Sequence, residues 1–302
     1  MFERMLAAVD ESARAEQVMR MGRALAQDSG GALIVLRVRP DPPVLDRVTN
    51  GDVALAEQTG ALRAAGIAAH YLVHAGSPER QIIETARQQR STLIIIAARE
   101  NGPHLAPRRR MTDRLAARAP APLLVIPEDN SQASVASTDV DGTEFFGPDG
   151  APVLVALDGS PLAERALPYA AELAARLGRP LALLRVASPL RSQEQLAEAW
   201  SYVESARRRV RERISRDLSI DAQVVVGAPI DELLWAVEGR RACAIVLTAR
   251  GQHEGRPQRA SAITLDVVRK LRIPALIIPS PVLASDPQVE LQPAKGLGDR
   301  AP

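Results

Sequence analysis

Cysteine, aromatic residues and long apolar runs are all scarce in this chain of 302 residues. Its single cysteine, Cys243, excludes a disulfide framework within the chain and is consistent with a reducing compartment. Because Cys243 begins an apolar, strand-like run, we interpret it as a small buried hydrophobic residue. Aromatic residues make up 3% of the chain, so the core must be built from alanine, valine, leucine and isoleucine.

The signals of a membrane, secreted or nucleic-acid-binding protein are also missing. The longest apolar runs, such as residues 93–98, are far shorter than the roughly 20 residues that span a bilayer. Residues 1–4 lead directly into the first expected strand, without a signal peptide. The net charge is +2, and the arginines are scattered among acidic residues. We therefore expect a cytoplasmic protein that binds neither nucleic acid nor membrane.

What the chain does contain is a long internal repeat. Residues 5–12 read MLAAVDES and residues 153–160 read VLVALDGS, so an apolar run ends in Asp-x-Ser in both copies. Near the end of each copy, APLLVIP at 121–127 corresponds to IPALIIP at 273–279. A repeat of this length indicates a duplicated domain, because solenoid units span only about 20–50 residues.

The repeat and the composition together predict two domains and two less regular segments. The first domain covers residues 1–128 and the second covers residues 151–280. Residues 129–150 are rich in serine, aspartate, glycine and threonine and form the expected linker. Residues 281–302 combine proline, glycine and mixed charge, and we expect a disordered tail there.

Within each copy, short apolar runs alternate with amphipathic ones, which predicts an α/β fold with a doubly wound, Rossmann-like parallel sheet between helices. Ser12 and Ser160 are candidate helix N-caps. The expected strands are 4–9, 32–38, 67–73, 92–98 and 122–127, then 152–157, 180–186, 220–226, 243–249 and 275–279. The expected helices are 12–28, 51–65, 78–90 and 110–118, then 160–177, 192–216, 229–240 and 260–271.

Ligands bind to such sheets beyond the carboxyl ends of the strands, where the strand order reverses. Asp10 and Asp158 follow the first strand of each copy, and a carboxylate there could accept a hydrogen bond from a ribose hydroxyl. Helix N-termini at the same edge offer free N–H groups to a phosphate. The candidate nucleotide-binding residues are Asp10, Val38, Asp158, Val186, Thr248, Arg250, Gly251 and Ser261.

The order and spacing of these segments are similar to those of the universal stress protein family. The resemblance rests on the Asp-x-Ser start, on ERAL at 164–167, on VVR at 267–269 and on IPALII at 273–278. It covers most of residues 1–280 and implies two five-stranded sheets of strand order 3-2-1-4-5. It also implies that the last strands of two domains pair at their edges, within one molecule or in a homodimer.

Family members that bind ATP carry Gly-x-x-Gly, nine further residues and then Gly-Ser/Thr, a loop whose amides approach the phosphates. Copy two has Thr248, Gly251 and Ser261 in this pattern, whereas copy one has Ala97 and Glu100 and loses every glycine. The resemblance thus makes ATP a candidate cofactor for the second domain only. A separate hypothesis for copy one is phosphate binding by the arginines at 108–110.

Motifs for catalysis are absent from the sequence. There is no Walker loop and no Gly-x-Ser-x-Gly nucleophile motif. The four histidines are not spaced as ligands of one metal. We therefore predict a stress-response regulator or binding module with an unidentified protein partner, not an enzyme. One alternative is a nucleotide-free scaffold. A second alternative, a slow ATPase or nucleotidyl enzyme, is disfavoured because the sequence lacks candidate catalytic groups.

Overall fold

The computed structural model describes residues 1–12, 14–27, 30–39, 50–98, 111–127, 148–187, 192–213, 217–250, 261–280 and 282. The first copy contains β1 (Arg4–Val9), α1 (Arg14–Gln27), β2 (Ala32–Arg39), α2 (Asn50–Ala64), β3 (Ala68–Ala75), α3 (Pro78–Gln88), β4 (Leu93–Ala97), α4 (Met111–Arg118) and β5 (Leu123–Ile126). The second contains β6 (Val153–Leu157), α5 (Pro161–Glu164), α6 (Leu167–Arg176), β7 (Leu181–Ala187), α7 (Gln193–Arg213), β8 (Ile220–Val226), α8 (Pro229–Gly239), β9 (Ala244–Thr248), α9 (Ala262–Lys270) and β10 (Ala275–Ile278). The order of strands and helices confirms the predicted α/β alternation.

One predicted helix, at 160–177, is divided in the structure into α5 and α6. Pro168 is the physical reason, because it has no N–H to donate and its ring crowds the carbonyl of Glu164, four residues earlier. Ser160 is nevertheless the N-cap of α5, as predicted. Its hydroxyl oxygen accepts a hydrogen bond from the backbone N–H of Ala163 at 3.1 Å.

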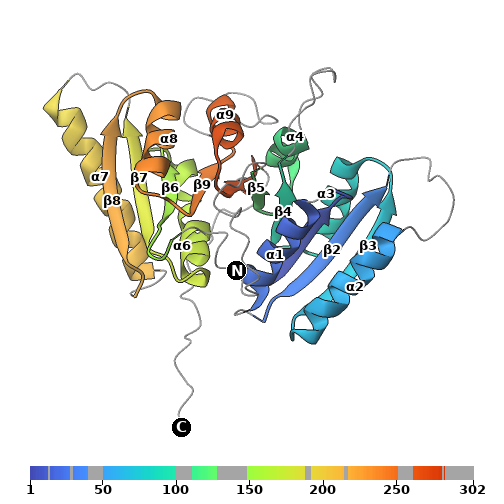
Figure 1. Ribbon diagram of the computed structural model, residues 1–302. Coiled ribbons are helices and arrows are strands. Elements are labelled where there is room, and N and C mark those ends of the chain that lie inside the picture. Colours follow the sequence, from blue (N-terminus) through green and yellow to red (C-terminus); the bar gives the residue numbers. More distant parts are fainter. Residues whose placement is uncertain are drawn as a thin grey trace, which may run out of the picture.

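The last strands of the two halves, β5 and β10, pair within the chain, which is one of the two arrangements that the family resemblance implied, so the two five-stranded sheets form one ten-stranded sheet (Figure 1). The strand order is β3-β2-β1-β4-β5-β10-β9-β6-β7-β8, so each half has the order 3-2-1-4-5. The halves join where β5 and β10 pair antiparallel, with Leu124 opposite Leu276. All other strand pairs are parallel, so the strands of the first half run opposite to those of the second. The carboxyl ends of the first-half strands and those of the second-half strands therefore lie at opposite edges of the sheet.

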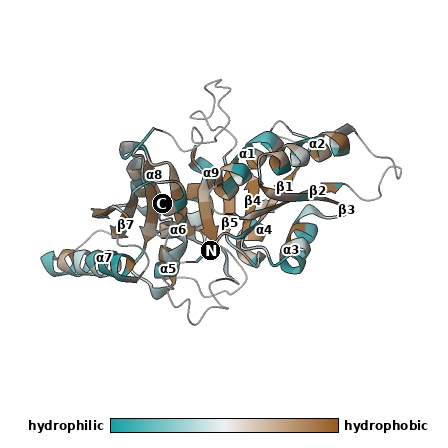
Figure 2. Cartoon of the chain, turned by 90° about the horizontal axis from the view of Figure 1, so that it is seen from below, coloured by the Kyte–Doolittle hydropathy of each residue, from teal (hydrophilic) through white to brown (hydrophobic). Residues whose placement is uncertain are grey.

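Apolar side chains cover both faces of the sheet, as expected for strands that lie between two layers of helices. Both cores continue across the β5–β10 junction. Leu124 and Leu276 belong to the core under α1, α2, α6 and α7, and Leu123 and Ile277 belong to the core under α3, α4, α8 and α9. Figure 2 shows the hydrophobic strands in brown, with teal hydrophilic residues on the helices. The two halves therefore share their hydrophobic cores.

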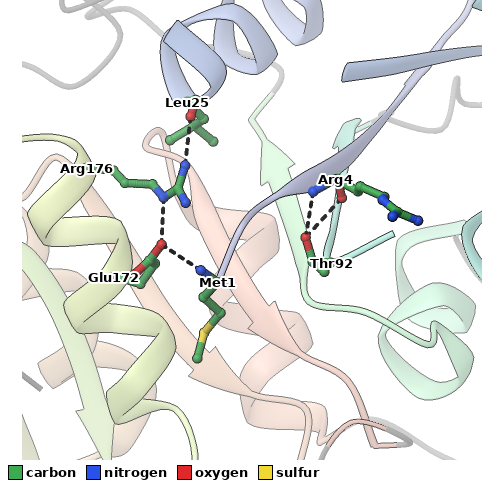
Figure 3. Close-up of polar contacts among 6 residues, drawn as sticks. All are labelled: Met1, Arg4, Leu25, Thr92, Glu172 and Arg176. Atoms are coloured by element: carbon green, nitrogen blue, oxygen red, sulfur yellow. Dashed lines mark hydrogen bonds and ion pairs between the residues drawn. The ribbon is translucent and has the colours of Figure 1, made fainter. Parts of the chain in front are cut away.

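Polar contacts at the helix ends reinforce this junction (Figure 3). Arg176 on α6 donates to the backbone carbonyl of Leu25 on α1 at 3.1 Å and to Glu172 at 2.8 Å. The guanidinium of Arg176 also lies 5.6 Å from the centre of the buried Phe2 ring. Glu172 in turn accepts a hydrogen bond from the Met1 amino group at 3.1 Å. These contacts tie the beginning of the first half to α6 of the second.

Glu172 makes part of the stability pH-dependent. Burial opposes its ionisation, but the hydrogen bond from Arg176 and the charge of the Met1 amino group outweigh burial and lower the pKa of Glu172. A carboxylate with a lowered folded-state pKa stabilises the protein above its unfolded pKa of about 4.3, and this contribution disappears as pH falls through the folded pKa. We expect Glu172→Gln to reduce the free energy of unfolding at pH 7, and the difference from wild type to shrink below about pH 4. Urea denaturation across this pH range measures it, and a pH-independent difference would contradict the explanation.

Cys243 is fully buried, which raises the pKa of its thiol to about 12 and confirms its role as a small core residue. Over the described ranges, no three His, Cys, Asp or Glu side chains come together as a metal site. Nor does any described helix have the length and apolar character to cross a bilayer.

Candidate functional site

The predicted site residues of the second half gather at the carboxyl edge of its strands. Leu157 at the end of β6 lies opposite Arg185 on β7, so Asp158, which follows β6, lies beside Val186, the residue before the last of β7. The order reverses at β6, which pairs with β7 on one side and with β9 on the other. This is the place in an open parallel sheet where ligands bind. Thr248 ends β9 at the same edge.

Asp158 organises the turn that leaves β6. One of its carboxylate oxygens accepts a hydrogen bond from the backbone N–H of Ser160 at 2.9 Å. Gly159 in this turn has φ +88°, a conformation that favours glycine. Asp10 plays the same part in the first half, where it accepts from the backbone N–H of Ser12 at 2.9 Å and from its hydroxyl at 2.5 Å. Each aspartate therefore stabilises, by hydrogen bonds, the turn that follows the first strand of its half.

Arg185 is the main side chain of this edge that sequence reasoning did not select. Its guanidinium donates to the carbonyl of Val186 at 2.5 Å and lies 5.9 Å from the centre of the Tyr202 ring. A β-carbon at Gly159 would be 2.9 Å from Nη2 of Arg185, so the glycine allows the close approach. Burial lowers the pKa of Arg185, and the charge of Asp158 opposes that shift. Across the described ranges, Arg185 makes no ion pair within 4.0 Å.

Tyr202 on α7 completes the wall behind Arg185. Its hydroxyl oxygen is buried and has no hydrogen-bond partner in the part of the chain that the structure describes. Burial, followed by the carboxylates of Glu164 and Asp158, raises the pKa of Tyr202 well above its ordinary value, so the hydroxyl keeps its proton as a donor. Glu164 is itself held by two hydrogen bonds from Arg209, at 2.6 and 2.7 Å.

The corresponding arginine of the first half, Arg37, is in a different electrostatic environment. It forms ion pairs with Glu11 and with Asp52, the latter at 3.3 Å, and Arg39 also pairs with Asp52. Arg37 and Asp52 are only 5% and 6% exposed. A β-carbon at Gly51 would collide with the Arg37 guanidinium, so the start of α2 packs directly on it. In the first half, side chains of the protein already neutralise this arginine.

The described ends of the loop between β9 and α9 are held by their own hydrogen bonds. The Thr248 hydroxyl donates to the carbonyl of Arg250 at 2.6 Å, and the N–H of Ser261 donates to the carbonyl of Ala249 at 2.6 Å. Thr264 on α9 donates to the carbonyl of Thr248 at 2.9 Å. Thr248 and Ser261 are both 8% exposed. These bonds bring the two ends of the loop together at the edge of the sheet.

The other predicted residues fall into two groups. Val186 is buried in the core under α8 and α9, and Val38 packs in part against that same core. Gly251 lies outside the described residues, as do Glu100 and the arginines at 108–110. Sequence reasoning missed Arg185 and Tyr202. A usable signal for the arginine was its presence at the same position of both copies, inside an otherwise apolar strand.

The two halves are thus related by duplication, and each is a doubly wound domain whose candidate site residues lie at the switch point of its strand order. A model of the universal stress protein family matches residues 1–127 and again residues 151–279. The chain therefore belongs to the universal stress protein family, with two family domains in tandem.

Solved structures with the same fold cover nearly the whole chain. A universal stress protein from Archaeoglobus fulgidus DSM 4304 is 19% identical, with a TM-score of 0.63 over 91% of this chain and 96% of that one. A protein of unknown function from Pseudomonas aeruginosa PAO1 is 16% identical, with a TM-score of 0.66 over 94% and 95%. The cytoplasmic domain of a prokaryotic cation chloride cotransporter is 12% identical, with a TM-score of 0.60 over 94% and 99%. At these identities the likeness concerns the fold alone. A search of curated proteins found no match.

Proposed function

We propose that this protein is a non-enzymatic binding module of the stress response whose second domain binds an adenine nucleotide. The observation that carries the proposal is the contrast between two equivalent arginines. Arg37 is neutralised by Glu11 and Asp52, whereas Arg185 makes no ion pair among the described residues. A half-buried guanidinium is stabilised by an anion that it can hydrogen-bond, and a nucleotide phosphate supplies one.

The other groups at the carboxyl ends of the second-half strands suit the remaining parts of a nucleotide. Asp158 lies at the end of β6, where a carboxylate accepts hydrogen bonds from ribose hydroxyls. The buried hydroxyl of Tyr202 is a donor without a partner in the described structure, and an anionic oxygen would satisfy it. Arg185 would supply charge that the incomplete glycine loop, with Thr248 and Ser261 in place of glycines, lacks.

The first domain serves as a structural partner in this proposal. A phosphate near Arg37 would have to compete with Glu11 and with Asp52, which is itself shared with Arg39. Displacing a buried carboxylate from its ion pairs is costly, since the carboxylate would be left without compensation. We therefore expect one nucleotide per chain and not two.

Isothermal titration calorimetry with ATP and Mg²⁺ tests this stoichiometry and its site. We expect one site per chain for wild type. Arg185→Met should weaken binding at least tenfold, because about 1.4 kcal/mol corresponds to a tenfold change and a charged hydrogen bond contributes about 1.5–3 kcal/mol. Asp158→Asn should also weaken binding, whereas the matched variant Asp10→Asn, at the equivalent position of the first domain, should leave the affinity unchanged.

The same titration separates the alternatives. No heat with millimolar ATP, from protein whose circular dichroism shows it to be folded, would favour the nucleotide-free scaffold. Equal losses in Asp10→Asn and Asp158→Asn would contradict a single site. Mass spectrometry of nucleotide released from heat-denatured protein provides an independent check. Turnover of ATP that is lost in Asp158→Ala would overturn the non-enzymatic assignment.

A further inference from the structure

Helix α8 carries Trp235, the most exposed large apolar side chain in the described structure, at 67%. The duplication supplies a direct comparison, because α3 is the equivalent helix of the first domain. Both helices have 11 residues and begin with a proline, Pro78 in α3 and Pro229 in α8. If the fold required a particular kind of side chain on the outer surface of this helix, α3 and α8 should carry similar residues at equivalent positions.

The outer side of α3 is an ordinary charged helix surface. It carries Arg80, Glu84 and Arg87, spaced one turn apart. Arg80 donates to Glu84 at 2.8 Å, a four-residue ion pair that is typical of a solvated helix. Nothing apolar is needed at this place for the helix to pack.

The equivalent positions of α8 are Asp231, Trp235 and Glu238, which we call the α8 face. Asp231 and Glu238 are exposed, and within the described ranges neither makes an ion pair. Both carboxylates lie one turn from the indole, at i−4 and i+3, on the same side of the helix. Relative to α3, this surface has exchanged two arginines for acids and has gained an exposed indole.

We propose that the α8 face docks an arginine- or lysine-bearing segment of a partner polypeptide. A guanidinium or ammonium group stacks favourably on an indole ring, and carboxylates on both sides attract the same cation. The acids repel polyanions, which excludes nucleic acid and anionic membranes as occupants. They also disfavour a second copy of this chain, because two α8 faces would bring like charges together. The face lies on the opposite side of the sheet from Arg185 and Tyr202, so the proposal is independent of nucleotide binding.

Fluorescence anisotropy with labelled peptides of alternating arginine and serine tests this surface. The full chain should bind the arginine peptide saturably and the matching glutamate–serine peptide not at all, and the affinity should fall as salt is added. Trp235→Glu should weaken binding at least tenfold. The same loss is expected when Asp231→Arg, Trp235→Glu and Glu238→Arg are combined, which gives α8 the surface that α3 already tolerates. Trp200→Glu is the matched control on α7, where Trp200 is 40% exposed, and it should leave the affinity unchanged.

Several results would overturn the proposal. One is the absence of peptide binding at millimolar concentration by folded wild-type protein. Another is equal affinity in wild type and the combined variant. Sedimentation equilibrium that shows self-association dependent on Trp235 would identify a second copy as the occupant. Flotation with neutral or anionic lipid vesicles, if it depended on Trp235, would identify a membrane.

Discussion

Leu276→Asp is expected to unfold the second domain and to destabilise the whole chain by about 4 kcal/mol or more. Leu276 is fully buried at the centre of the ten-stranded sheet, opposite Leu124 on β5. Both leucines belong to the core that passes from one half to the other. An aspartate at 276 would lose the packing of a leucine and would place a carboxylate where the described structure offers it no cation.

Guanidinium denaturation followed by circular dichroism measures this loss. Ile263→Asp on α9 is the matched control, because Ile263 is 43% exposed and lies in the first turn, where an acid suits the helix dipole. The control should stay within about 0.5 kcal/mol of wild type. Since the core is shared, a single transition should move to lower denaturant in Leu276→Asp. A first-domain transition that stayed at its wild-type midpoint would contradict the shared core.

Asp52→Asn should destabilise the first domain by about 3 kcal/mol, the second largest effect that we expect. Asp52 is 6% exposed and pairs with both Arg37 and Arg39. With an asparagine at position 52, the remaining ion-pair partner of the buried Arg37 in the described structure would be Glu11. The side chain of Glu11 is 72% exposed. Burial, followed by the charge of Arg39, lowers the pKa of Arg37, so the Arg37 cation is in an unfavourable environment that the loss of an acid would make worse.

Urea denaturation at neutral pH measures the effect of Asp52→Asn. Glu57→Gln is the control, because Glu57 is exposed on the same helix, α2, and should cost less than about 0.5 kcal/mol. ATP binding by the second domain should be retained in any Asp52→Asn protein that remains folded. A loss of stability equal to that of Glu57→Gln would show that the Arg37 pair does not support the first domain.

The fold was predictable because its signals are local and occur twice. Apolar runs such as residues 93–98 are too short for helices and apolar on both faces, which indicates covered parallel strands. The prediction of one helix at 160–177 was wrong, although Pro168 within it is a signal in the sequence for the division. The hydrophobic pattern did not predict that β5 and β10 pair with each other, because the residues of an edge strand and of a central strand can be equally apolar.

The sequence predicted that the candidate site lies at the carboxyl ends of the strands, but not which charged side chains surround it. Asp158 follows β6 and Val186 lies near the end of β7, and a parallel sheet brings the carboxyl ends of neighbouring strands together, so their proximity follows from topology. The environment of Arg185 did not follow, because it depends on Tyr202, which reaches the strand from a helix later in the chain. The difference between the two arginines also depends on Asp52, near the start of α2, the helix that packs on Arg37.

The sequence by itself thus determined the duplication, the order of strands and helices, and the family, because each depends on residues close together in the chain. Only the tertiary structure decided that the halves share one sheet and that the surroundings of Arg37 and Arg185 differ in charge. The physical reason is that ion pairs and hydrogen bonds depend on distances between side chains from different elements. In the first domain these distances let Glu11 and Asp52 neutralise an arginine, and in the second domain the equivalent arginine forms no ion pair within 4.0 Å among the described residues.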